Sequence, residues 1–98
     1  MKYFAVTRVP GPSWDTSLPM RRQKNWKEHA EFMDALADEG FVVLGGPLGE
    51  GEKRFLLIFH AESEKAIRAR LAADPWTPTK MLRITRIKPW EILLGETE

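Results

Sequence analysis

Cysteine is absent from the 98-residue sequence, and histidine occurs only twice. The absence of cysteine excludes disulfide bonds, thiolate nucleophiles and cysteine-based zinc or iron–sulfur sites. Two histidines with scattered acidic residues match no metal-binding motif, so we expect neither a metal ion nor another cofactor. Chemistry that depends on a metal or on a thiolate is therefore not expected.

An excess of charge and a long hydrophobic run are also missing. Lysine and arginine number 15 against 14 acidic residues, and the densest basic cluster (Arg21, Arg22, Lys24) is followed at once by acids, which is typical of a solvated helix entry. No run approaches the roughly 18 apolar residues of a membrane span, and the opening residues MKYFAVTRV lack the features of a signal peptide. We expect a cytoplasmic protein that binds neither nucleic acid nor membranes.

Apolar runs and breaker residues predict a single domain over residues 1–98. The expected strands are Tyr3–Val9, Phe41–Leu44, Phe55–Phe59 and Met81–Leu94, and the expected helices are 23–39 and 64–73. This order predicts a ferredoxin-like α+β fold, βαββαβ, with four antiparallel strands and two helices on one face. Pro89 favours an edge position for the last strand. Residues 10–22 form a long proline-rich loop, and loops of this length are often functional.

Apolar side chains are expected on both faces of the sheet. In the third strand, Phe55, Leu57 and Phe59 point one way and Leu56 and Ile58 the other. In the second strand, strict alternation puts residues 42 and 44 together on one face. The helices cover only one face, so the other predicts a homodimer with two sheets face to face, a dimeric α+β barrel.

His29 is the leading candidate for chemistry, because its helical position places it on an apolar stripe. A buried imidazole needs a hydrogen-bonding partner. Asp74 continues the apolar stripe of the second helix, and Pro75 ends that helix. The two groups are expected at opposite ends of the helices unless the Asp74-Pro75 bend carries the carboxylate across. Contact would leave one ring nitrogen free as a general base or acid; the alternative is a core histidine that specifies packing.

Five further residues are candidate substrate contacts. Gly45, Gly46 and Pro47 are expected in a turn over residues 45–51 that allows close backbone approach, although a plain hairpin turn or bulge explains them equally well. Trp14 in the long loop and Trp76 after the Asp-Pro pair could line a pocket or serve packing. No helix and no Lys-Ser/Thr pair follow the glycines, so they do not form a phosphate loop.

Several short motifs occur in a distinctive order along nearly the whole chain. They are MKYFAV at the start, His29 within WKEHAEFMDAL, Gly40-Phe41, GGPL at 45–48, Ser63 heading the second helix, Asp74-Pro75 and Pro89-Trp90. Together they resemble the YCII-related (YciI-like) family of small ferredoxin-like dimers, and GPSWDTSLP resembles a subgroup with a longer first loop. The resemblance implies that His29 and Asp74 form an active-site pair, on a fold similar to that of muconolactone isomerases.

The residues and the resemblance together predict a small-molecule enzyme without a metal or a covalent nucleophile. Asp74 would orient His29, which would move a proton on a bound substrate. Isomerisation, elimination and lactone hydrolysis all fit such a pair. The alternatives are a non-catalytic metabolite-binding module on the same dimeric barrel, and a structural partner for another protein.

Overall fold

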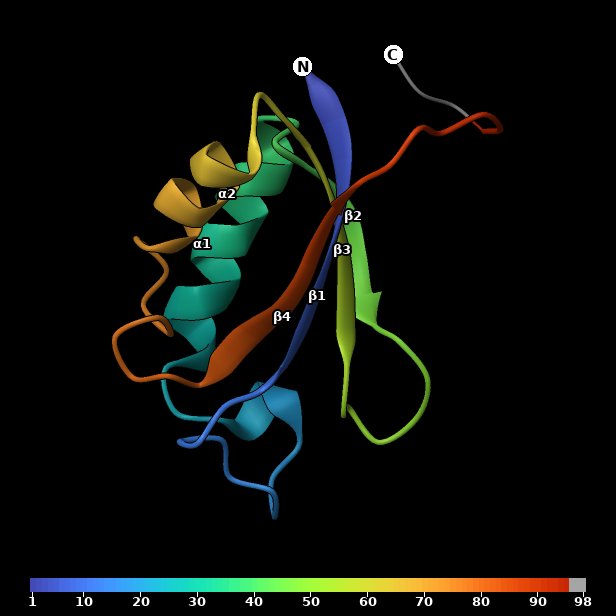
Figure 1. Cartoon of the computed structure of the whole chain (residues 1–98). Helices are drawn as coiled ribbons and strands as arrows, with labels where there is room; N and C mark the ends of the chain where they lie inside the picture. The colour runs from blue at the N-terminus through green and yellow to red at the C-terminus, as the bar shows by residue number, and fades with distance from the viewer. Residues whose placement is uncertain (96–98) are drawn as a thin grey trace.

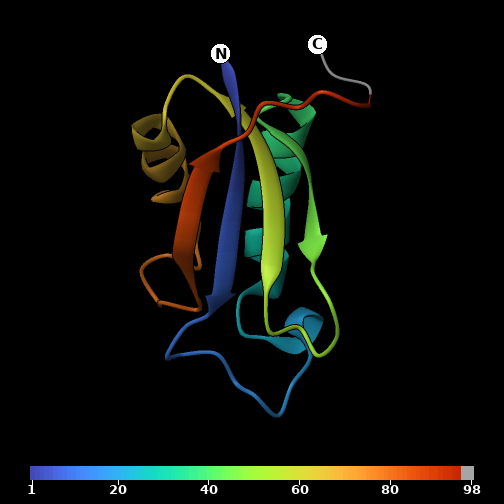
Figure 2. The same cartoon turned by 45° about the vertical axis from the view of Figure 1, so that its right-hand side comes forward.

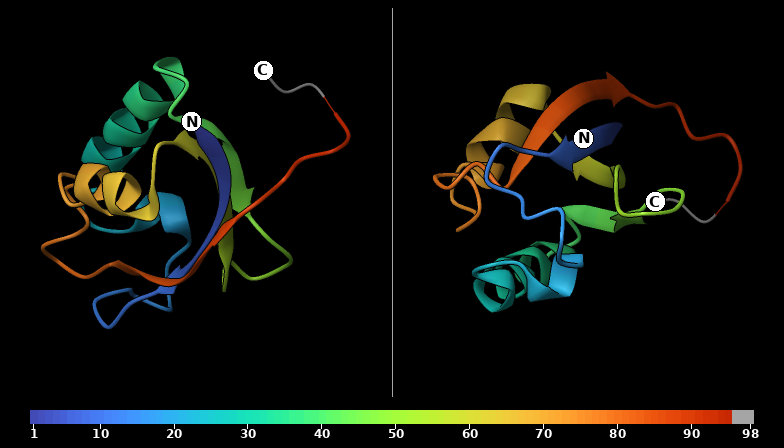
Figure 3. Two further views of the ribbon diagram at one scale, coloured as in Figure 1. Left: turned by 45° about the horizontal axis from the view of Figure 1, so that its top comes forward. Right: turned by 90° about the horizontal axis from the view of Figure 1, so that it is seen from below.

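A computed structural model describes residues 1–95 of the chain. Its elements are β1 (Lys2–Pro10), the short 3₁₀ helix η1 (Met20–Arg22), α1 (Trp26–Asp38), β2 (Val42–Pro47), β3 (Phe55–Ala61), α2 (Glu64–Leu71) and β4 (Leu82–Pro89). Apart from η1, their order is the βαββαβ of the ferredoxin-like α+β fold, as the sequence predicts. Both helices lie on one face of the sheet (Figures 1 and 3).

The four strands form one antiparallel sheet in the order β2-β3-β1-β4. Figure 2 shows the strands side by side with the helices behind them. β4 is an edge strand, as its proline predicts. The central strands β1 and β3 carry most of the core, and Val6 and Phe59 are fully buried against the helices. Burial of each such side chain stabilises the fold by about 1.5–3 kcal/mol.

The prediction of a turn over residues 45–51 is wrong in its first half. Gly45, Gly46 and Pro47 belong to β2, and the turn begins after them. Strand propensity is weak at glycine and proline, but β2 is an edge strand with only one neighbour, where proline is tolerated.

A β-bulge in β2 also changes which side chains share a face. Val42 pairs with Phe59 but Leu44 pairs with Ile58, so residues 42 and 44 lie on opposite faces rather than together. The extra residue of a bulge shifts the alternation by one position. As a result Gly45 is turned toward the helices.

The ends of several elements differ from those expected. α1 begins at Trp26 because Asn25 adopts a left-handed conformation with φ of 62°. The buried side chain of Gln23, expected in the helix, instead makes hydrogen bonds with the backbone of Asp15 and Leu18 and so anchors the preceding loop. α2 ends earlier than expected, at Leu71, and β4 ends at Pro89, five residues before the expected end.

The sheet face without helices carries apolar side chains near its centre. Ile58 is only 3% exposed there, whereas Leu44 on the neighbouring strand is 62% exposed. Leu56 beside them is half-buried. Leu44 and Leu56 therefore form the exposed apolar surface on this face, whereas Ile58 is already covered.

Candidate active site

His29 and Asp74 are in contact. Nδ1 of His29 lies 2.8 Å from Oδ2 and 3.0 Å from Oδ1 of Asp74. Both side chains are buried, His29 at 5% and Asp74 at 1% exposure. A carboxylate accepts hydrogen bonds, so Nδ1 carries the proton, and in the neutral ring Nε2 is left as the acceptor.

The short α2 explains how the two residues meet. The chain leaves α2 at Leu71 and descends beside the first turns of α1, as Figure 1 shows for the segment drawn in orange. Tight turns guide this path, with Asp74 N–H bonded to the Leu71 carbonyl and Thr77 N–H to the Asp74 carbonyl. The bend at Asp74 thus carries its carboxylate to the start of the other helix.

Asp74 has two further partners that suit a buried carboxylate. Its Oδ1 accepts the backbone N–H of Trp76 at 2.9 Å, a local bond typical of aspartate in turns. A guanidinium nitrogen of Arg8 lies 3.8 Å from Oδ2. Buried charges need such hydrogen bonds and counter-charges, so Asp74 is held as the centre of a small polar cluster.

Trp76 fixes the plane of the histidine ring. The two rings stack at a centroid distance of 3.8 Å and an interplanar angle of 8°. The buried indole donates its Nε1–H to the Lys24 carbonyl at 2.7 Å. Trp14 packs edge-on against Trp76 and also contacts Phe55. Trp76 therefore limits the orientations of the His29 ring directly, and Trp14 supports it through its contact with Trp76.

A pocket of about 230 Å³ opens between α1 and the sheet beside His29. The helix contributes Trp26, His29 and Met33 to its walls, and β2 contributes Gly45 and Gly46. Of the five expected substrate contacts, these two glycines line the pocket. Pro47 pairs with Phe55 at the end of β2, and neither Pro47 nor the tryptophans at 14 and 76 form its lining.

Gly45 keeps one wall of this pocket free of side-chain atoms. A Cβ atom at this position would lie 3.1 Å from Cγ of Leu57, closer than ordinary contact. A Cβ at Gly46 would meet nothing within 4 Å. A side chain at the first glycine would therefore press on Leu57 on the helix side of β2.

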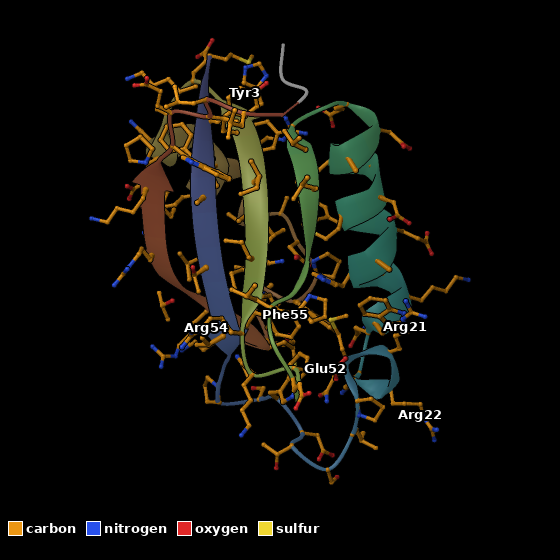
Figure 4. All side chains as sticks on the ribbon, turned by 90° about the vertical axis from the view of Figure 1, so that its right-hand side faces the viewer. Tyr3, Arg21, Arg22, Glu52, Arg54 and Phe55 are labelled. Carbon is orange, nitrogen blue, oxygen red and sulfur yellow. The ribbon has the colours of Figure 1, made fainter. Side chains whose placement is uncertain are left out.

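The loop segment that lines the pocket is tied to the β2–β3 hairpin. Met20 of η1 lines the pocket, and its backbone N–H donates to Oε1 of Glu52 at 2.7 Å. Figure 4 shows Glu52 of the β2–β3 hairpin beside η1, which carries Arg21 and Arg22. The long loop thus helps to shape the entrance.

Arg8 is the main residue that the sequence interpretation missed. It lines the pocket and is 7% exposed. Burial lowers the pKa of Arg8, and the charge of Asp74 opposes that shift. A signal was present in the sequence, because Phe4, Val6 and Arg8 alternate onto one face of β1 and the third member is charged.

Within residues 1–95 the structure has no cluster of three or more potential metal ligands. In the same part of the chain no helix has the length and apolar character needed to span a membrane.

Comparisons with known proteins agree with this fold. One solved structure that matches is the 5-chloro-2-hydroxyhydroquinone dehydrochlorinase from Burkholderia phenoliruptrix AC1100, in complex with 2,5-dihydroxybenzoquinone. The TM-score is 0.67 at 23% sequence identity, with 91% of this chain and 93% of the other covered. At this identity the likeness concerns the fold. A search of curated proteins returned no match.

The family model of the YCII-related domain matches residues 2–91. That range includes β1, the His29 helix and the Asp74 turn, and it ends just beyond β4. Because the match covers nearly the whole chain, the protein belongs to the YCII-related family, as its motifs predict.

Proposed function

We propose that this protein is a small-molecule enzyme in which His29 moves a proton on a substrate held between α1 and β2. The contact between His29 and Asp74 on the wall of a pocket is the observation that carries this proposal. Asp74 fixes the tautomer, and Trp76 fixes the ring plane. A positioned general base of this kind contributes roughly 10²–10⁴-fold to a reaction rate.

In the proposed reaction, Nε2 of His29 removes a proton from the substrate, and Asp74 stabilises the imidazolium that forms. Return of the proton to another atom gives an isomerisation, whereas departure of a leaving group with its electron pair gives an elimination. Attack by a water that His29 deprotonates gives lactone hydrolysis. The similar fold of a dehydrochlorinase makes elimination the first reaction to test.

The substrate contacts follow from the pocket walls. Gly45 and Gly46 bring the β2 backbone close to the bound molecule. We assign Trp14 and Trp76 to the support of the His29 ring, and Pro47 to the end of the wall that β2 provides. A cytoplasmic location is part of the proposal, and cell fractionation tests it.

A homodimer is part of the proposal. The helix-free sheet face presents Leu44 and Leu56, and a second copy placed sheet to sheet would bury them. Light scattering at micromolar concentration should give twice the mass of the chain. A monomer mass would contradict this arrangement.

Proton transfer can be tested with a panel of compounds before the substrate is identified. The protein is incubated in deuterated water with unsaturated lactones, chlorinated hydroquinones and hydroxybenzoquinones, and NMR follows deuterium incorporation, isomerisation and loss of chloride. Wild type should convert at least one compound. Folded His29→Gln should lose this activity, and Asp74→Asn should lower it by roughly 10²-fold or more.

Glu31→Gln is the matched control, because Glu31 is exposed on the same helix as His29 and lies outside the pocket. This variant should keep full activity. Binding of a compound that wild type never converts would instead favour the non-catalytic binding module. Unchanged turnover in folded His29→Gln would refute the proposal.

A further inference from the structure

Arg8 occupies a position that apolar residues normally fill. It lies on the helix-facing side of β1, paired with Phe55 on one neighbouring strand and with Ile84 on the other. Its side chain is almost completely buried. An arginine in a sheet core loses hydration, and this loss costs several kcal/mol unless other groups replace the water.

The groups around the guanidinium replace that water poorly. Its distance to Oδ2 of Asp74 is 3.8 Å, too long for a hydrogen bond. Its one hydrogen bond within the described residues goes to Sδ of Met33 at 4.0 Å, a weak acceptor. Nε has no hydrogen-bond partner at all among these residues. Most of the five N–H donors of this arginine are therefore unused.

Asp74 cannot satisfy Arg8 fully, because its oxygens already serve two other donors. Oδ1 accepts from Trp76, and both oxygens face Nδ1 of His29. Arginine keeps its charge at neutral pH even where burial lowers its pKa. The cluster thus contains a cation whose remaining N–H groups can receive a second anion.

Arg8 lines two hollows: one beside α2 that Arg68 and Leu71 also line, and the pocket that His29 lines. Only the second brings an anion bound to Arg8 beside the imidazole. Its volume of about 230 Å³ exceeds the roughly 150 Å³ cavity that holds a benzene molecule, and it falls short of sites for drug-sized ligands. Trp26, Met33 and Leu57 give it apolar walls. A single planar ring with one charged oxygen suits both its size and its lining.

We propose that this pocket selects a single-ring organic anion whose charged oxygen binds the guanidinium of Arg8 while the ring lies beside His29. This inference rests on the proposed function, since it names the substrate class of the same site. The charged oxygen belongs to a carboxylate or to an ionised enol or phenol. During proton removal by His29, Arg8 would stabilise negative charge that develops on that oxygen.

One acidic residue also borders the pocket and must be weighed against Arg8. Asp34 is exposed at the rim. Water and salt screen an exposed carboxylate, whereas a buried cation acts in a medium of low dielectric constant. The charge of Arg8 therefore dominates inside the pocket.

The experiment compares two probes of almost the same shape, benzoate and the neutral benzamide, by calorimetry with the full chain. Wild type should bind benzoate roughly tenfold or more tightly than benzamide. Arg8→Gln should abolish this preference, and Arg8→Lys should keep part of it. Arg86→Gln changes the net charge equally at an exposed arginine of β4 outside the pocket, and it should behave as wild type.

A third probe, 2,5-dihydroxybenzoquinone, distinguishes the two kinds of anion. A larger loss of affinity for this probe than for benzoate in Arg8→Gln assigns the oxygen to an ionised enol, and the reverse assigns it to a carboxylate. Thermal unfolding of each variant confirms that it is folded. If Arg8→Gln does not fold, the inference is still tested by the affinities of wild type for benzoate and benzamide and by the preference that Arg8→Lys keeps.

Equal binding of benzoate and benzamide by wild type, or a preference that survives in folded Arg8→Gln, would overturn the inference. Absence of any anion binding up to ~10 mM would do so too. Failure here is distinguishable from failure of the proposed function. Proton transfer that depends on His29 but shows no preference for anions refutes only the role of Arg8, and anion binding without proton transfer refutes only the role of His29.

Discussion

Replacement of Asp74 by alanine should destabilise the protein far more than replacement of any exposed acid. The substitution removes the acceptor for Nδ1–H of His29 and for the Trp76 N–H, and it removes the carboxylate nearest to Arg8. Each buried donor left without a partner costs about 1–3 kcal/mol. Removal of one partner of a buried ion pair costs about 3–5 kcal/mol.

Because these losses share one site they do not add fully, and we expect a decrease of about 3–6 kcal/mol in the free energy of unfolding. Asp74→Asn retains one oxygen acceptor and should lose about half as much. A domain of this size has only about 5–15 kcal/mol to lose. Asp74→Ala is therefore expected to lie close to the limit of folding at 37 °C.

Urea unfolding followed by tryptophan fluorescence measures this difference. Asp34→Ala is the matched control, because this exposed acid should change stability by less than about 0.5 kcal/mol. His29→Ala and the double variant complete a cycle in which a coupling of about 0.5–3 kcal/mol between the two residues is expected. A loss below about 1 kcal/mol in Asp74→Ala, with an unchanged denaturant slope, would refute the reasoning.

Three further predictions concern the pocket and its loop. Gln23→Ala should cost about 1–3 kcal/mol in urea unfolding, because three hydrogen bonds of that side chain hold the long loop. Gly45→Val should clash with Leu57 and fill the pocket, so that the benzoate binding expected of wild type disappears in a folded variant. Hydrogen bonds from Ser17 lower the pKa of Asp15, so Ser17→Ala should raise it in an NMR titration. The stability linked to Asp15 is present above its ordinary pKa and is lost as the pH falls through the lowered value. Ser17→Ala should weaken this dependence without removing it, because the backbone N–H of residue 17 still donates to Asp15.

The partnership of His29 and Asp74 could be predicted from residue type, but its geometry could not. Helical periodicity placed both groups on inner faces. Their meeting depends on how far α2 extends, and helix ends are set by local turn bonds that sequence patterns locate poorly. Because α2 stops at Leu71, the following residues are free to run back to the start of α1.

The arrangement of β2 shows a different limit. Alternation along a strand holds only while the register is regular, and the bulge after Val42 reverses it for the glycines that follow. Nothing in the residues 41–47 marks the extra position. The sequence named Gly45 and Gly46 as candidates, but it assigned them to a turn instead of to the wall of a pocket.

The burial of Arg8 was not predicted from the sequence, and the reason is physical. A charged residue within an apolar run is commonly interpreted as facing solvent, because charge is rarely buried. Counting from Phe4 by twos assigns it to the core face, and only the carboxylate of Asp74, brought from the far end of the sequence, makes that burial tolerable. The burial of Arg8 and the turn that brings Asp74 next to it therefore depend on each other.

The segment from Asp74 to Trp76 connects the His29 side chain to the long loop. Trp76 donates one N–H to Asp74, stacks on His29, donates another N–H to the carbonyl of Lys24 and contacts Trp14. Trp14 lies in the long loop, and Lys24 follows it. A displacement of either residue would tilt the Trp76 indole, and the tilted indole would change the plane of the His29 imidazole. Replacement of a buried polar cluster by apolar residues is often stabilising, so stability alone does not account for this assembly. The proposed function accounts for its order, because proton transfer requires Nε2 of His29 to be held in a fixed direction.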